Sequence, residues 1–150
     1  MRQEESWKVH PIHKLKGVFI MNNVFSDHEH EALYHEFLAR MRCDDAYHRA
    51  AAYLISLDLQ LRIVPDLVFD FDNDAIRPEA LDGAFQTQSS LRTTKLLFNL
   101  WNGWCNEAEY DADGGFLQRG NLASGYTLYD LLGMSYNEFY IEAIRIRFLT

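Results

Sequence analysis

The stretch Ser89-Ser-Leu-Arg-Thr-Thr-Lys-Leu-Leu-Phe-Asn-Leu-Trp-Asn-Gly103 decides the fold class of this chain. A serine hydroxyl at its start and a glycine at its end are typical of a helix over about residues 91–102. The apolar face of that helix comprises Leu96, Leu97, Leu100 and Trp101, with Phe98 at the margin. The opposite face carries Arg92, Lys95, Asn99 and Asn102. This pattern predicts an amphipathic helix that packs against a core.

Further helix signals precede this stretch. Ser26-Asp-His-Glu29 has the pattern of a capping box and predicts a helix over about 27–40. Asp44 or Asp45 is suited to cap a second helix over about 46–59. Pro78 marks the first turn of a short helix at 77–81, because the missing N–H of proline costs nothing there.

Helix signals also follow the stretch. Residues 127–132 predict a short helix that ends at Gly133, and Ser135-Tyr-Asn-Glu138 predicts a capped start for a last helix that reaches about Phe148. Apolar residues occur almost all round the last helix, which predicts a central position in the bundle. Arg147 falls on an apolar side of this helix, so we expect it to have a buried carboxylate partner.

Together these signals predict a mainly α fold, a single-domain helical bundle of about five or six helices with short irregular or strand pieces. Residues 1–16 are expected to form a polar N-terminal arm. Residues 17–150 are expected to form a single helical domain with a Gly-rich loop at about 103–126. Asp113-Gly-Gly115 predicts a loose hairpin inside that loop.

The charge balance limits the class of partner. The chain has 150 residues, of which 22 are acidic and 14 are basic, and its net charge is −8. This charge predicts repulsion from nucleic acid and from anionic membranes, so we expect neither as a direct partner.

Hydropathy and cysteine usage indicate a compartment. No apolar run approaches the roughly 20 residues that span a bilayer, and the first residues lack the apolar segment of a secretory signal. Cys43 and Cys105 lie far apart and have no metal-binding or redox spacing. These features predict a cytoplasmic protein without a disulfide.

Acidic residues cluster in two segments, at 58–82 and at 107–113. Solubility is the ordinary explanation for such clusters, and a partner protein with a basic surface is the alternative. The candidate binding residues are Asp66, Asp70, Asp72, Asp74, Glu107, Glu109, Asp111 and Asp113.

Histidine offers a second kind of chemistry. His48 and Arg49, with nearby carboxylates, carry groups that suit acid–base catalysis, although a structural ion-pair network explains the same residues. His28, Glu31 and His35 share one face of the first predicted helix. Two turns separate these histidines, which is long for joint ligation of one metal ion. His30 lies on the apolar face and is expected to pack in the core.

Asp70-Phe-Asp-Asn-Asp74 begins like a calcium-binding loop. Ala75 and Leu81 then occupy the loop positions where an EF-hand needs Gly and Glu, so a standard EF-hand is excluded. The pattern favours a turn that Phe69 and Phe71 anchor to the core. No metal site and no cofactor are therefore assigned from the sequence.

Several blocks of the chain together resemble an uncharacterised family of small proteins from Gram-positive Firmicute genomes, phages and integrative elements. The blocks are Asp44-Asp-Ala-Tyr-His-Arg-Ala-Ala-Ala-Tyr-Leu54, Phe69-Asp-Phe71, Ile76-Arg-Pro-Glu-Ala-Leu81, Phe85-Gln-Thr87, Leu97-Phe-Asn-Leu-Trp-Asn-Gly103 and Glu142-Ala-Ile-Arg-Ile-Arg-Phe148. The resemblance spans about residues 25–148. It implies a bacterial cytoplasm and a mobile-element context, and it transfers no catalytic residue because the family has no established activity.

Three functional hypotheses follow from the sequence. The first is an acidic interaction protein of phage or mobile-element origin, which binds a host protein such as a nucleic-acid-handling or defence enzyme and inhibits it. The second is a small enzyme that uses His48, Arg49 and nearby carboxylates. The third is a structural module that forms homo-oligomers through exposed aromatic residues. The acidic clusters favour the first hypothesis.

Overall fold

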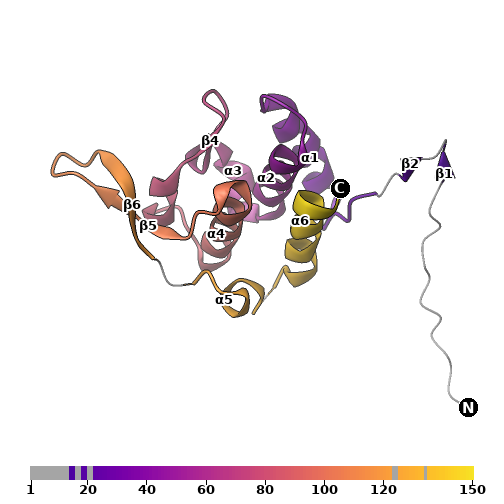
Figure 1. Ribbon diagram of the computed structural model, residues 1–150. Coiled ribbons are helices and arrows are strands. Elements are labelled where there is room, and N and C mark those ends of the chain that lie inside the picture. Colours follow the sequence, from indigo (N-terminus) through magenta and orange to yellow (C-terminus); the bar gives the residue numbers. More distant parts are fainter. Residues whose placement is uncertain (1–13, 16–17, 20–21, 123–124, 134) are drawn as a thin grey trace, which may run out of the picture.

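Helix α2 (Ala46–Leu57) lies at the centre of the computed structural model, and other helices pack around it (Figure 1). Nine of its twelve residues are buried. Asp45 caps α2 by accepting hydrogen bonds from the backbone N–H groups of Tyr47 and His48. The small side chains of Ala50, Ala51 and Ala52 allow neighbouring helices to approach closely.

The structure describes residues 14–15, 18–19, 22–122, 125–133 and 135–150. The other α-helices in these ranges are α1 (His28–Arg40), α3 (Leu59–Ile63), α4 (Gln88–Asn102), α5 (Leu128–Leu132) and α6 (Asn137–Leu149). Two 3₁₀ helices are η1 (Pro65–Leu67) and η2 (Pro78–Asp82). The strands are β1 (Lys14–Leu15), β2 (Val18–Phe19), β3 (Phe69–Asp70), β4 (Ala75–Ile76), β5 (Asn106–Tyr110) and β6 (Phe116–Leu122). The mainly α, single-domain prediction is confirmed.

The start of α1 differs from the predicted capping box. Asp27, not Ser26, caps the helix, and its Oδ1 accepts a hydrogen bond of 2.7 Å from the N–H of His30. Glu29 does not return to the cap, because it pairs with Arg62 of α3 at 3.1 Å. Tyr34 and Phe37 of this helix are buried in the core.

The helix predicted over about 46–59 ends at Leu57, and the separate helix α3 begins at Leu59. Asp58 ends α2 and caps α3, and its carboxylate accepts hydrogen bonds from the N–H groups of Gln60 and Leu61. Only 2% of Asp58 is exposed, and Ser89 of α4 donates a hydrogen bond to it over 2.8 Å. A buried carboxylate with these donors is satisfied at the point where the chain changes direction.

Helix α4 starts three residues before the predicted position. Ser89 or Ser90 was predicted to cap the helix, but the N-cap is Thr87, which forms a reciprocal capping box with Ser90. Gly103 ends the helix in the left-handed conformation with φ of 75°, as predicted from its place after the last periodic residue. Phe98 is fully buried, so the prediction of a marginal position was wrong.

Helix α6 covers α2 from one side and is not the central helix. Ile141 and Phe148 are 57% and 61% exposed, so its apolar residues do not all face the core. The predicted capping box does not form, because Tyr136 occupies the N-cap with φ of 73° and makes no side-chain cap. Thr93 of α4 and the hydroxyl of Tyr140 share a buried hydrogen bond of 2.6 Å that joins the two helices.

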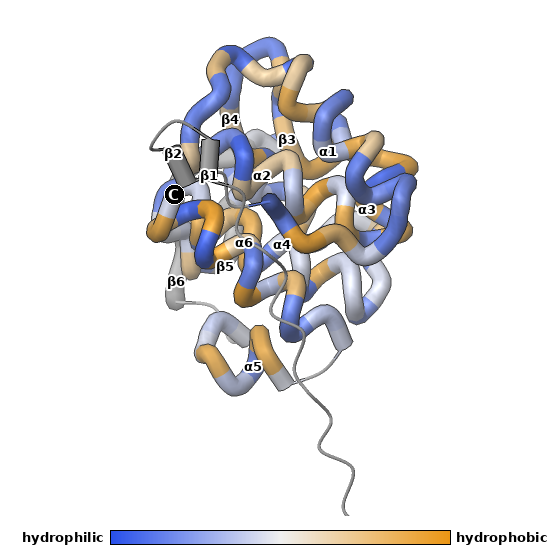
Figure 2. The backbone as a smooth tube through the Cα atoms, turned by 90° about the vertical axis from the view of Figure 1, so that its right-hand side faces the viewer, coloured by the Kyte–Doolittle hydropathy of each residue, from blue (hydrophilic) through white to orange (hydrophobic). Residues whose placement is uncertain are grey.

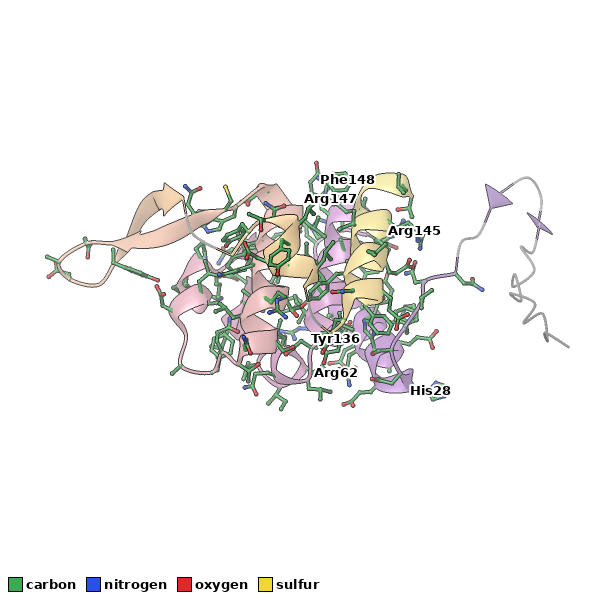
Figure 3. The ribbon with its side chains drawn as sticks, turned by 90° about the horizontal axis from the view of Figure 1, so that it is seen from below. His28, Arg62, Tyr136, Arg145, Arg147 and Phe148 are labelled. Atoms are coloured by element: carbon green, nitrogen blue, oxygen red, sulfur yellow. The ribbon has the colours of Figure 1, made fainter. Side chains whose placement is uncertain are left out.

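Arg147 has no carboxylate partner among the described residues, contrary to the prediction. Its Nε donates to the carbonyl oxygen of Leu100 over 2.8 Å, and its guanidinium lies 3.4 Å from the ring centroid of Tyr47. Figure 3 shows Arg147 beside Phe148 at one end of α6, with Tyr136 at the other end. A helix-end carbonyl and an aromatic face replace the expected ion pair.

Two hairpins project from the helices. Strands β3 and β4 are antiparallel and enclose a four-residue turn over 71–74, and β5 pairs with β6 in the predicted hairpin (Figure 1). Hydrophobic and hydrophilic residues alternate along the helices around α2, as a helix with one buried face requires (Figure 2). Among the described residues, no helix combines the length and the apolar character needed to cross a bilayer.

Candidate functional site

The two acidic segments of the sequence meet in the structure. Helix η2 carries Glu79 and Asp82 from the first segment and contacts strand β5, which belongs to the second. Burial, together with the negative charges of Asp82 and Glu79, raises the pKa of Tyr110 at the end of β5. We define the acidic face as Glu79, Asp82, Asp111 and Asp113.

Three predicted binding residues are engaged within the chain. Asp66 pairs with Arg40, and Asp70 pairs with Arg77 at 3.1 Å. Asp74 accepts from His48, so it is directed into the domain. Asp70 also holds the β3–β4 turn, and the hydrogen bonds that it accepts from Asn73 lower its pKa. These aspartates are therefore less available to a partner than the sequence indicated.

The other predicted acids lie on the two projecting hairpins. Asp72 is exposed at the tip of the β3–β4 hairpin. Asp111 fixes the β5–β6 turn, because its Oδ1 accepts from the N–H groups of Asp113 and Gly115. Asp113 is exposed, and Glu107 and Glu109 lie in β5 with side chains outside the described part of the chain.

Arginine side chains are largely committed to intrachain contacts. The ion pairs join Arg40 to Asp66, Arg49 to Asp44, Arg62 to Asp27 and Glu29, Arg77 to Asp70 and Glu79, and Arg145 to Glu142. Within the described ranges, Asp72, Asp82 and Asp113 have no basic partner. The surface around η2 and the two turns therefore presents a net negative charge.

His48 lies in a polar cluster at the start of α2. Its Nδ1 is 2.7 Å from Asp45 Oδ1 and 3.4 Å from Cys43 Sγ. Its Nε2 is 2.9 Å from Asp74 Oδ1, on the β3–β4 turn. The edge of the ring meets Trp101 of α4 at a centroid distance of 5.0 Å. Four residues from three parts of the chain thus surround a histidine that is only 5% exposed.

The charges in this cluster do not favour a cysteine nucleophile. Burial opposes a charge on His48, but hydrogen bonds with Asp45 and Asp74 outweigh it and raise the pKa of the imidazole. Desolvation and the same two carboxylates raise the pKa of the Cys43 thiol. A thiol with a raised pKa is a weak nucleophile, so the arrangement differs from that of a cysteine hydrolase.

The residues that the enzyme hypothesis combines do not converge. His48 is buried and paired with carboxylates, whereas Arg49 is directed to Asp44 at the surface. The cavities bordered by His28, by Lys95 and by Arg40 are lined by neither His48 nor Arg49. The geometry of this pair is that of structural ion pairs.

The histidine face of α1 borders an open cavity of about 720 Å³. His28, Glu31 and His35 line it with Phe25 and Tyr34. Their metal-binding atoms do not meet: within the described part of the chain, Cys43, Asp45 and His48 form the group of three such atoms that lie within 4.8 Å of one another. Asp70 and Asp74 of the calcium-like segment are likewise turned to different partners.

Sequence reasoning identified His48 but missed the rest of its cluster. Cys43 and Asp45 lie five and three residues before His48, and this spacing across a helix start was the available signal. Asp74 is 26 residues away, so no local pattern connects it to His48. The predicted core position of His30 is confirmed by its complete burial.

Comparison with known proteins assigns the chain to a family. No curated protein and no solved structure matches the chain. Residues 21–150 match a family described as a family of unknown function, DUF6075. This match agrees with the resemblance to an uncharacterised family and covers most of the chain. The protein is thus a member of the DUF6075 family.

Proposed function

We propose that this protein is an interaction protein that binds a basic surface of a partner protein through its acidic face. The contact between η2 and β5 carries the proposal, because it joins two acidic segments that are separate in the sequence. Pairing of Arg40 and Arg77 within the chain supports it, since carboxylates already match both of these positive charges. Complementary charge accelerates association and selects partners.

The chemistry of the acidic face indicates a class of partner. Enzymes that handle nucleic acid present grooves of Lys and Arg for phosphate. A projecting hairpin whose turn carries Asp111 and Asp113 offers carboxylates to such a groove. We infer a host enzyme of this class as the partner, and inhibition by occupation of the groove as the mechanism. We also propose that this protein originates from a phage or another mobile element.

The first prediction compares two variants of equal charge. One carries Glu79→Gln, Asp82→Asn and Asp113→Asn, and the other carries Glu31→Gln, Glu36→Gln and Glu138→Gln on α1 and α6. Each variant changes the net charge from −8 to −5, that is −8 + 3. Asp111 is kept, because it holds the turn. We expect the acidic-face variant to bind its partner at least about tenfold more weakly and the α1/α6 variant to bind as the wild type does.

The measurement is affinity capture from nuclease-treated lysate of a Gram-positive bacterium at low and moderate salt, followed by titration of the captured protein. A salt-sensitive protein partner that the α1/α6 variant retains would support the proposal. Equal binding by all three proteins would exclude the acidic face as the contact. Failure to capture any stoichiometric partner would reject the interaction function itself.

A further inference from the structure

We propose that Cys43, Asp45 and His48 form a binding site for a divalent transition-metal ion, and that zinc fits it best. This site is separate from the acidic face and does not depend on the interaction function. The three residues lie within six positions of the chain, around the start of α2. They offer a sulfur, a carboxylate oxygen and an imidazole nitrogen, the ligand types that zinc takes in proteins.

The three ligand atoms lie close enough together to reach one ion, since all are within 4.8 Å of one another. A zinc–sulfur bond of about 2.3 Å and a zinc–nitrogen or zinc–oxygen bond of about 2.1 Å place the two ligand atoms roughly 3.6 Å apart. Cys43 Sγ lies 3.4 Å from His48 Nδ1 and 3.5 Å from Asp45 Oδ2. Cys43 Sγ also lies 3.6 Å from His48 Nε2, so the exposed Cys43 side chain rotates to bring its sulfur towards the ring plane, where an ion on Nδ1 must lie.

The distance between Asp45 and His48 is shorter. Asp45 Oδ1 and His48 Nδ1 are 2.7 Å apart, whereas a nitrogen and an oxygen that bind one zinc ion are roughly 3.4 Å apart. Asp45 Oδ1 also caps α2, so the cap is kept if the ion binds Oδ2, and the 48% exposed side chain has room for this adjustment. His48 can keep its position, because its ring is held from the other side.

Asp74 supplies that support. Its carboxylate oxygens lie 2.9 and 3.0 Å from His48 Nε2, the nitrogen opposite the proposed metal. A histidine ligand that donates its second N–H to a carboxylate is the usual arrangement in metal sites, because the partner fixes the ring and increases its basicity. The edge contact with Trp101 restricts the ring further.

The β3–β4 turn positions Asp74 for this role. Asp74 has φ of 57°, a left-handed conformation that aspartate tolerates better than most residues. Asp70 stabilises the same turn by accepting hydrogen bonds from the N–H groups of Asp72 and Asn73. The carboxylate is therefore presented to His48 by a turn that has its own hydrogen bonds.

The site is open to solvent and balanced in charge. Cys43 is exposed, so water or another ligand has access to the fourth position of a tetrahedral ion. One thiolate and one carboxylate neutralise a divalent ion, while the imidazole is neutral. Three protein ligands with an open position are typical of zinc sites that bind a further molecule.

The test uses cobalt, which replaces zinc in tetrahedral sites and absorbs light. Reduced, chelator-treated full-length protein is titrated with Co²⁺ alone, and the thiolate-to-cobalt charge-transfer band is recorded. We expect a single saturable site per chain, whose band disappears when Zn²⁺ is added. Cys43→Ser should abolish the band and Cys105→Ser should retain it. Asp74→Asn should weaken cobalt binding by about 10- to 100-fold.

Several outcomes would overturn the proposal. One is a wild-type protein without a charge-transfer band, and another is a band of full strength in Cys43→Ser. A band that is lost in Cys105→Ser but kept in Cys43→Ser would place the metal at the other cysteine. Circular dichroism of each variant checks the fold, and His48→Gln, with Asp74 retained, provides a second variant that should lose the band.

Discussion

Replacing Arg62 with methionine is expected to lower the free energy of unfolding by about 3 kcal/mol. The side chain of Arg62 is only 5% exposed. Its Nε donates to the carbonyl oxygen of Ser56 over 2.6 Å, and its two terminal nitrogens bind Asp27 at 2.9 Å and Glu29 at 3.1 Å. One guanidinium thus connects the end of α2 to the start of α1.

The size of this effect follows from the exposure of the partners. Loss of one member of a fully buried ion pair costs about 3–5 kcal/mol. Asp27 and Glu29 are 47% and 69% exposed, so they regain water when Arg62 is removed. The carbonyl of Ser56 lies in the core and loses a donor, which keeps the cost near the lower limit of that range.

Arg49→Met is the matched control, because Arg49 forms an exposed pair with Asp44. Such a pair contributes less than about 1 kcal/mol. Urea unfolding followed by circular dichroism measures both variants. Equal losses of stability for the two substitutions would show that the contacts of Arg62 do not hold α1 to α2.

Acidification is expected to destabilise the protein through His30 by about 2 kcal/mol between pH 7 and pH 5. His30 is completely buried, and burial lowers its pKa from 6.5 to about 4. Its Nδ1 accepts from the N–H of Ser26 over 3.1 Å, and its Nε2 donates to the carbonyl of Tyr53 over 3.0 Å. A proton on Nδ1 would remove the acceptor that Ser26 needs.

The sign follows from the direction of the shift. Because the pKa of His30 is lower in the folded state, the unfolded chain binds the proton first, so stability is complete above pH 6.5 and is lost as the pH falls towards 4. His48 acts in the opposite direction. Its pKa is raised on folding, so its contribution is complete below its unfolded pKa and is lost as the pH rises through its folded value.

A comparison of wild type with His30→Gln isolates the effect of His30, since His48 is present in both proteins. Urea unfolding at pH 7 and pH 5 gives the free energy for each. The wild type should lose about 2 kcal/mol more than the variant over this interval. The same pH dependence in both proteins would mean that His30 does not carry the acid sensitivity.

The sequence predicted elements that local rules control. The 3.6-residue period and Gly103 gave α4, and the Gly-rich segment gave the β5–β6 hairpin. Features that depend on contacts between residues far apart in the sequence were not predicted. Ser26 and Asp27 are both good caps, and Arg62, 35 residues away from Asp27, binds Asp27 and Glu29 in the structure. Apolar content alone does not show that Ile141 and Phe148 face solvent.

The same contrast between local sequence signals and long-range contacts applies to the candidate sites. His48 was selected from the sequence as a chemically active residue, and the acidic segments were selected from their charge. Neither the approach of η2 to β5 nor the position of Asp74 opposite His48 has a local signal. Both contacts depend on the tertiary packing of later segments of the chain around α2, which involves residues throughout the core.

The central position of α2 also has a consequence during synthesis on the ribosome. Helix α2 ends at residue 57, whereas α6, which covers one side of it, begins at residue 137. Until that part of the chain emerges, the surface of α2 that α6 will cover is open to solvent. The nascent protein must therefore carry an exposed apolar helix for most of its translation, a state in which chaperones bind and chains aggregate.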